Sequence, residues 1–192
     1  HKPHLLTTVK NNLGAETHIT YAPSTSFYLA DKEAGRPWIT RLPFPVHVVE
    51  QVESLDRISG NRFVTRYAYH HGYFDGEERE FRGFAMVEQF DAEEFAPSDD
   101  PWFVPSVMTR TWFHTGLFEG RGHISDLLAR EYYRPPGVTD PQALPLPDTV
   151  LPPGLTSDEE REACRALKGS MLREEVYALD GTDKEPHPYT VT

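Results

Sequence analysis

Apolar and polar residues alternate along much of the chain, and this two-residue period predicts β-strands. The clearest example is a hairpin in which residues 46–56 and 62–73 flank a turn at residues 59–61. One face of its second strand is strongly aromatic and is predicted to carry Phe63, Thr65, Tyr67, Tyr69, His71 and Tyr73. The other face is predicted to carry Arg62, Val64, Arg66, Ala68 and His70. The chain is therefore expected to build a sheet from long antiparallel strands.

Further strands are predicted where β-branched and aromatic residues gather between turn residues. An N-terminal hairpin joins residues 5–10 to residues 15–21, and later strands are predicted at residues 77–81, 84–90, 107–115, 171–179 and 188–192. A connector containing residues 31–35 follows the first hairpin, and Pro43 and Pro45 delay the next strand. Residues 91–105 are interpreted as an acidic surface loop anchored by Phe95, Trp102 and Phe103.

Two helices are predicted in the second half of the chain. Thr156 and Glu159 have the spacing of a capping box, which predicts a helix over residues 156–168 that ends at Gly169. Residues 124–133 have apolar side chains at helical spacing and predict a shorter amphipathic helix. Residues 134–155 are rich in proline, and their leucine and valine side chains favour a strap laid over a surface. Residues 1–192 are thus expected to be one mainly β segment, with antiparallel twisted sheets, long hairpins, one or two short helices and a Pro-rich strap.

The segment from Gly72 to Gly83 is predicted to set a strand reversal and a bend. Asp75 and Gly76 form a dipeptide typical of tight turns, and the isolated Gly83 after Arg82 indicates a bulge. We expect Glu80 to pair with Arg79 or Arg82 across or along the ladder. The residues with a predicted structural role are Gly72, Asp75, Gly76, Glu80, Arg82 and Gly83.

Composition and charge exclude several classes of protein. The chain has 192 residues, a formal net charge of -11 and a mean hydropathy of -0.56. No apolar run approaches the roughly 20 residues that a spanning helix needs, so direct membrane insertion is not expected. The negative charge disfavours nucleic acid and anionic lipid as partners. The single cysteine, Cys164, excludes an internal disulfide and is expected to face the core from its helix.

The residues suited to catalysis or metal binding form no recognised motif. His70 and His71 are neighbours on a strand and would point to opposite faces, and no helix carries a pair of histidine ligands at metal-binding spacing. No Gly-x-Ser-x-Gly elbow marks a nucleophile. Paired carboxylates for glycoside chemistry could come from the acidic group Asp75, Glu77, Glu78 and Glu80, but the interleaved arginines favour surface ion pairs. We therefore expect no catalytic, cofactor-binding or metal-binding residue.

Several stretches of the chain resemble one protein family. The longest is YHHGYFDGEEREFRGF, residues 69–84, and others lie at residues 11–15, 21–25, 35–46 and 167–177. Together they resemble the B component of bacterial Tc insecticidal toxin complexes, a group related to the SpvB-type virulence proteins. The resemblance spans nearly the whole chain, and Ala85 departs from it at a position where a glycine is expected.

The resemblance implies that the chain is a middle-to-C-terminal segment of a larger toxin B component. In that family the B component and its C partner, built from Rhs/YD-type strands, form a hollow shell that encloses a cytotoxic cargo. The implied partners are the toxin C component and the remaining segments of the B component, and the A pore component is contacted only indirectly. The resemblance also implies a secreted, extracellular protein that is not an enzyme and has no cofactor.

Two other functions remain open from the residues alone. The acidic group could serve a carbohydrate-active enzyme, and aromatic residues such as Trp102 and Trp112 could serve a carbohydrate-binding β module. A segment of the toxin shell is the first interpretation, because the resemblance implies it and the search for a catalytic motif found none.

Overall fold

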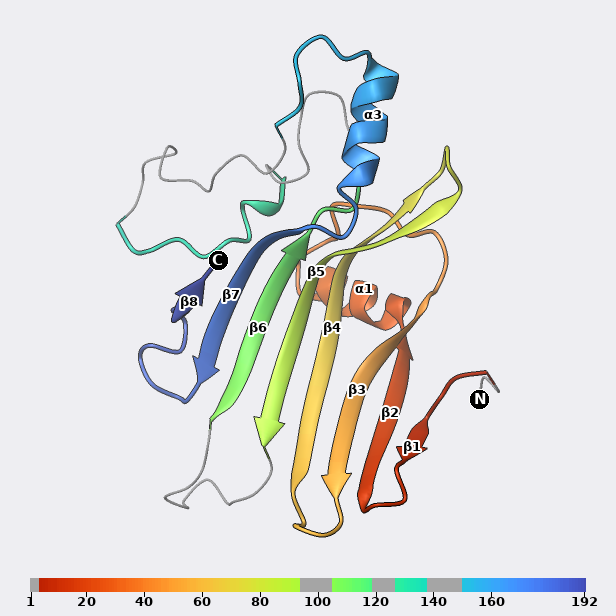
Figure 1. Ribbon diagram of the computed structural model, residues 1–192. Helices are drawn as coiled ribbons and strands as arrows, with labels where there is room; N and C mark the ends of the chain where they lie inside the picture. The colour runs from red at the N-terminus through yellow and green to blue at the C-terminus, as the bar shows by residue number, and fades with distance from the viewer. Residues whose placement is uncertain (1–3, 94–104, 119–126, 138–149) are drawn as a thin grey trace.

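The computed structural model describes residues 4–93, 105–118, 127–137 and 150–192, and its strands form one antiparallel sheet (Figure 1). The strands follow one another across the sheet in chain order, from β1 to β8. Their bounds are Thr8–Lys10 (β1), Ala15–Pro23 (β2), His47–Asp56 (β3), Arg62–Asp75 (β4), Glu80–Glu93 (β5), Ser106–Phe113 (β6), Met171–Leu179 (β7) and Thr190–Val191 (β8). The predicted mainly β, antiparallel fold is confirmed.

The two longest strands, β4 and β5, have 14 residues each and pair along their full length. β5 differs from its prediction at both ends. It begins at Glu80 because residues 76–79 form the turn, and it continues to Glu93, so the predicted strand from residue 77 and the predicted loop from residue 91 are wrong at these positions. Residues 94–104, with Phe95, Trp102 and Phe103, lie outside the described residues.

One helix was not predicted from the sequence. α1, Ser24–Glu33, forms the first part of the expected connector between β2 and β3. Phe27 and Tyr28 are residue types that favour strands, and the first turn has no acidic residue, so neither the propensity nor the capping pattern indicated a helix. α1 packs against β4 (Figure 1), where the ring centroids of Phe27 and Tyr69 lie 5.6 Å apart in an edge-to-face contact. Tertiary packing therefore overrides the local propensity.

The second helix, α3, spans Ser157–Ala166 and begins at the predicted capping box. The Thr156 hydroxyl accepts a hydrogen bond of 3.4 Å from the backbone N–H of Glu159, whose carboxylate accepts one of 2.8 Å from the N–H of Thr156. Cys164 is 1% exposed, which confirms that it faces inward. No helix among the described residues has the length and apolar character needed to cross a bilayer.

The main core cluster is formed by one strand pair and the segment that packs over it. It consists of Ala85, Met86, Trp112, Leu128 and Tyr132. The rings of Trp112 and Tyr132 meet edge to face, with centroids 5.0 Å apart. Leu128 and Tyr132 come from the segment predicted as a short helix, in which residues 127 and 128 are helical and residues 119–126 lie outside the described part. Residues 138–149 of the predicted strap also lie outside it.

Candidate functional site

The β4–β5 hairpin ends in a turn over residues 76–79. The Asp75 carboxylate closes this turn, because Oδ1 accepts hydrogen bonds from the N–H groups of Glu77 at 3.0 Å and Glu78 at 3.2 Å. Arg79 supplies the left-handed backbone, with φ of 53°. A Cβ atom added to Gly76 would have no neighbour within 4 Å, and the φ of Gly76 lies outside the left-handed region. The turn therefore depends on Asp75 and Arg79 more than on Gly76.

The glycines on either side of the turn have different roles. Gly83 has φ of 96° beside a register shift between Tyr73 and Phe74, and this backbone conformation favours glycine. A Cβ atom on Gly72 would lie 2.8 Å from the Trp38 ring and 2.9 Å from the Leu42 side chain. Gly83 thus allows an irregular ladder, whereas Gly72 makes room for the chain that follows α1.

Arg82 is a buried cation at the base of the hairpin, with 3% of its surface exposed. Its Nη2 donates to Oδ2 of Asp75 at 3.0 Å, and its Nε lies 3.1 Å from Oε2 of Glu80. Glu80 also accepts a hydrogen bond of 2.8 Å from Nζ of Lys168, and this bond lowers the pKa of Glu80. The structure therefore pairs Glu80 with Arg82 and with a lysine beyond α3, and shows no such pairing with Arg79.

The acidic residues of the turn face basic residues of α3. Arg161 forms an ion pair with Glu77 and lies 3.8 Å from the carboxylate of Glu78, which is 3.7 Å from Arg165. These contacts attach α3 to the tip of the hairpin, as the two elements lie side by side in Figure 1. The acidic group considered for glycoside chemistry is therefore an ion-pair network with basic partners, not a pair of free carboxylates.

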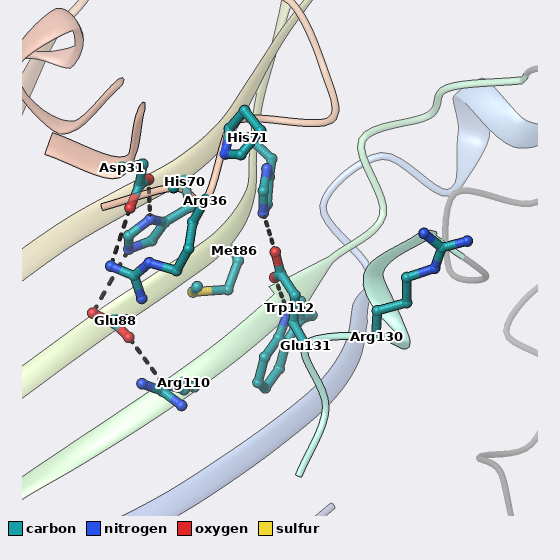
Figure 2. Close-up of a pocket in the computed structure, with 12 residues that line it drawn as sticks. Asp31, Arg36, His70, His71, Met86, Glu88, Arg110, Trp112, Arg130 and Glu131 are labelled. Atoms are coloured by element: carbon teal, nitrogen blue, oxygen red, sulfur yellow. Dashed lines mark hydrogen bonds and ion pairs between the residues drawn. The ribbon is translucent and has the colours of Figure 1, made fainter. Parts of the chain in front are cut away.

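A cavity of about 580 Å³ lies on the sheet between the end of α1 and the segment that closes the core (Figure 2). Charged and imidazole side chains dominate its wall, which is formed by Asp31, Gly35, Arg36, Pro37, His70, His71, Met86, Glu88, Arg110, Trp112, Arg130 and Glu131. Since several of these groups are buried, water screens their charges weakly, and each charge depends on its protein partners.

A chain of alternating charges crosses this cavity from α1 to β6. Nδ1 of His70 lies 2.5 Å from Oδ2 of Asp31, and its Nε2 lies 3.7 Å from Oε2 of Glu88. Nε of Arg110 donates to Oε1 of Glu88 at 2.8 Å. Burial acts to raise the pKa of Glu88, but the contact with His70 and the charge of Arg110 outweigh it and lower that pKa to about 2. The cavity thus holds Glu88 as a carboxylate.

His71 lines the same cavity as His70, so the prediction that the two rings point to opposite faces is wrong. The reason is the backbone of His71, which has φ of 55° and departs from regular strand geometry. Its Nδ1 accepts a hydrogen bond of 3.2 Å from the N–H of Ile39, and its Nε2 lies 2.7 Å from Oε1 of Glu131. Nε1 of Trp112 donates to the other oxygen of Glu131 at 3.3 Å.

The acidic side chains and the imidazoles of the cavity contact one another. Within the described ranges, no group of three or more His, Cys, Asp or Glu side chains could hold a metal ion. The His70–His71 pair was a partial signal for this site, but the acidic partners Asp31 and Glu131 lie 39 and 60 residues away from their histidines in the sequence. The chemistry that the arrangement supports is charge pairing between segments.

A second buried charge joins the core segment to β7. Glu175 is 0% exposed, and its carboxylate accepts hydrogen bonds from the Tyr133 N–H at 2.9 Å, the Tyr177 hydroxyl at 2.6 Å and Nε of Arg173 at 2.5 Å. The alternation along β7 places Glu175 on the same face as Arg173 and Tyr177, and both Glu175 and Tyr177 are buried there. Each oxygen of this buried carboxylate has a donor, as the low dielectric of the interior requires.

Comparison with known proteins decides the family. The family model described as the insecticide toxin TcdB middle/N-terminal region matches residues 1–116. The chain belongs to this family. The model of the TcdB middle/C-terminal region matches residues 162–192. A search of curated proteins found no match. The two TcdB regions share one sheet here, because β6 of the first pairs with β7 of the second.

Solved structures of Tc toxin complexes contain the same fold. In the TcdB2-TccC3-Cdc42 crystal structure, the match has 35% identity and a TM-score of 0.77, and it covers 97% of this chain and 9% of that one. In the Photorhabdus luminescens Tc holotoxin pore with a mutant TccC3, the match has 35% identity and a TM-score of 0.79, and it covers 97% of this chain and 9% of that one. In the TcdB2-TccC3-TEV crystal structure, the match has 35% identity and a TM-score of 0.78, and it covers 99% of this chain and 9% of that one. The chain of this TcdB family member thus spans about a tenth of the chains that it matches.

The carbohydrate-binding alternative finds no support in this TcdB-family structure. Trp112 is 0% exposed within the core and cannot stack on a sugar from solvent. Trp102 lies outside the described residues. The buried tryptophan instead packs against Tyr132 and donates a hydrogen bond to Glu131.

Proposed function

We propose that this chain is a wall segment of the hollow shell that a toxin B component forms with its C partner, and that it has no catalytic activity of its own. The observation that supports this proposal most is the match over 97% of the chain, at 35% identity, to a structure of TcdB2 in complex with TccC3. The chain spans 9% of the matched chain, so the whole protein's enclosure and delivery of cargo are part of the proposal.

The arrangement of the sheet supports a wall function. Each strand pairs with the next in an antiparallel meander, which yields a broad surface from a continuous stretch of chain. The parts of the chain that match the middle/N-terminal and middle/C-terminal TcdB models lie in one sheet. This arrangement supports residues 1–192 acting as one structural unit. The buried charges described above pair with one another, so their arrangement favours mechanical cohesion over turnover.

The partners follow from the family and are likewise proposed. The direct partners would be the toxin C component and the remaining segments of the B component, and the A pore component would be reached through them. The holotoxin pore among the matched structures supports this assignment. The assembled toxin would act outside the bacterium, as a secreted complex.

Protection of the cargo from protease tests this proposal. The parent B chain and its cognate C component are produced together, and degradation of the enclosed C-terminal part of the C component is followed after protease addition. A Glu175→Ala variant, which breaks the buried network of β7, should expose the cargo faster, whereas the matched Glu174→Ala variant on the other face of β7 should not. If β7 were loosened only in Glu175→Ala but the cargo were degraded at the same rate in both variants, this segment would not be part of the barrier. Electron cryo-microscopy of the same complex gives an independent check, because the sheet should lie in the shell wall.

A further inference from the structure

His70 and His71 are adjacent in the chain, are 6% and 3% exposed, and each holds a different segment of the protein against β4 (Figure 2). His70 contacts Asp31 of α1, and His71 contacts both Ile39 and Glu131. The segments before and after β4 in the chain therefore depend on two neighbouring imidazoles. The hydrogen-bond requirements of the two rings are different.

Both ring nitrogens of His70 face carboxylate oxygens. Asp31 lies 2.5 Å from Nδ1, and Glu88 lies 3.7 Å from Nε2. A neutral imidazole has one N–H group and could satisfy one of these acids, whereas the imidazolium has an N–H directed toward each. Burial acts to lower the pKa of His70, but its contacts with the carboxylates of Glu88 and Asp31 outweigh burial and raise that pKa. The surrounding charges are Arg36, which lies 3.4 Å from Asp31, and Arg110, which is bonded to Glu88.

The surroundings of His71 require the neutral ring instead. The N–H of Ile39 points at Nδ1, so this nitrogen must offer a lone pair and cannot carry a proton. Nε2 must then carry the hydrogen, which it donates to Glu131 at 2.7 Å. Besides Glu131 and the adjacent His70, the charged side chain of Arg130 also lies on the cavity wall, and Figure 2 shows it directed away from the ring.

We propose that His70 and His71 hold opposite protonation states in the folded protein, His70 as imidazolium and His71 as the neutral Nε2–H tautomer, and that together they form a pH-dependent clasp. Loss of the His70 proton at alkaline pH removes the positive charge between Asp31, which keeps the Trp38 indole N–H as a donor, and Glu88, which keeps Arg110. The loss of this charge loosens α1 from the sheet. This clasp does not rest on the proposed shell function and can be tested apart from it.

Nitrogen NMR of the histidine rings tests the protonation states directly in the unmodified protein. With ¹⁵N-labelled imidazoles, His70 should show two protonated nitrogens at about pH 7, whereas His71 should show one protonated nitrogen, Nε2, and one bare nitrogen, Nδ1. The partly exposed His18 of β2, which lies outside the cavity, gives a third ring signal for comparison. A common protonation state for His70 and His71 at this pH, or a His71 ring protonated at Nδ1, would overturn the proposal.

Hydrogen exchange then tests the mechanical consequence. Between about pH 7 and a pH at which the ring NMR signals show His70 to be neutral, exchange of the α1 amides, corrected for the intrinsic pH dependence, should accelerate at least about tenfold. A His70→Gln variant should exchange fast at both pH values, and His18→Gln should behave like the unmodified protein. If His70→Gln does not fold, the comparison of the unmodified protein at the two pH values still decides the question. Exchange of α1 that is independent of pH after correction would contradict the clasp.

Discussion

Glu175 accepts a hydrogen bond of 2.6 Å from the hydroxyl of Tyr177 in the interior of the protein, where the two residues are 0% and 4% exposed. Burial and this carboxylate raise the pKa of Tyr177, so the phenol remains a donor over the whole physiological range. The same carboxylate holds Arg173 and the backbone of Tyr133. One acidic side chain therefore joins β7 to the segment that closes the core.

The first prediction concerns this acid. Glu175→Ala should lower the free energy of unfolding by about 3–5 kcal/mol, because it leaves the Arg173 charge buried without its partner. Urea unfolding followed by circular dichroism measures the change. Glu174→Ala is the matched control, since Glu174 is only half-buried and its carboxylate accepts a long hydrogen bond of 3.5 Å from the Thr111 hydroxyl. A loss of equal size in both variants would show that the buried network has no special role.

The second prediction compares two glycines of one hairpin. Gly83→Ala should lower the free energy of unfolding by about 1–2 kcal/mol, because an L-residue is strained at the positive φ of this position. Gly76→Ala should change it by less than about 0.5 kcal/mol, since its φ is ordinary and its Cβ would meet open space. Thermal unfolding of the two variants checks the contrast. If Gly83→Ala were neutral, the idea that Gly83 sets the bend would fail.

The third prediction concerns the attachment of α3 to the hairpin tip. The ion pairs of Arg161, Arg165 and Lys168 with the tip of the hairpin are partly exposed, so each stabilises the attachment only weakly and is weakened further by salt. Hydrogen exchange of the α3 amides should therefore become faster when sodium chloride is raised, and Arg161→Gln should reproduce part of this effect at low salt. Arg57→Gln, which removes an ion pair with Glu16 far from α3 in the sheet, should leave α3 unchanged. Protection of α3 that does not respond to salt would indicate attachment by apolar contacts.

The fourth prediction is a loss of stability in acid that depends on Glu88. The folded-state pKa of Glu88 is lowered from 4.5 to about 2, so its contribution is present in full above pH 4.5 and is lost as the pH falls toward 2. The size of this contribution is on the order of 3 kcal/mol. Urea unfolding between pH 2 and pH 7 measures the free energy of unfolding. Glu88→Gln should reduce the decline of this free energy below pH 4.5, whereas Glu33→Gln on the exposed side of α1 should not. If the free energy of unfolding of Glu88→Gln declined in acid as steeply as that of the unmodified protein, the loss of stability would have to come from other groups.

The strands could be predicted from the sequence because their signal is local. In β7 the alternation of Leu172, Glu174 and Val176 with Arg173, Glu175 and Tyr177 gave the bounds Met171–Leu179 correctly. The capping box at Thr156 marked the start of α3 for the same reason. Turn residues were less informative, because Arg79 adopts the left-handed conformation that glycine usually supplies, and the expected start of β5 was therefore too early.

The cavity could not be predicted, because its geometry depends on contacts between distant residues. Asp31 reaches His70 only because α1 forms, and α1 is stabilised by packing on Tyr69 more than by its own propensity. The φ of His71 breaks the alternation that a strand pattern assumes, and it turns a neighbouring pair toward one cavity. A sequence read with ideal strand geometry places these rings on opposite sides and hides the site.

The chain-order arrangement of the eight strands bears on how the protein is made. Each new strand needs only the strand that was synthesised before it, so the sheet can extend by one strand at a time as the polypeptide leaves the ribosome. No strand has to be inserted between two that are already paired. A sheet of this design can therefore be laid down progressively during translation, before any distant part of the polypeptide has been synthesised.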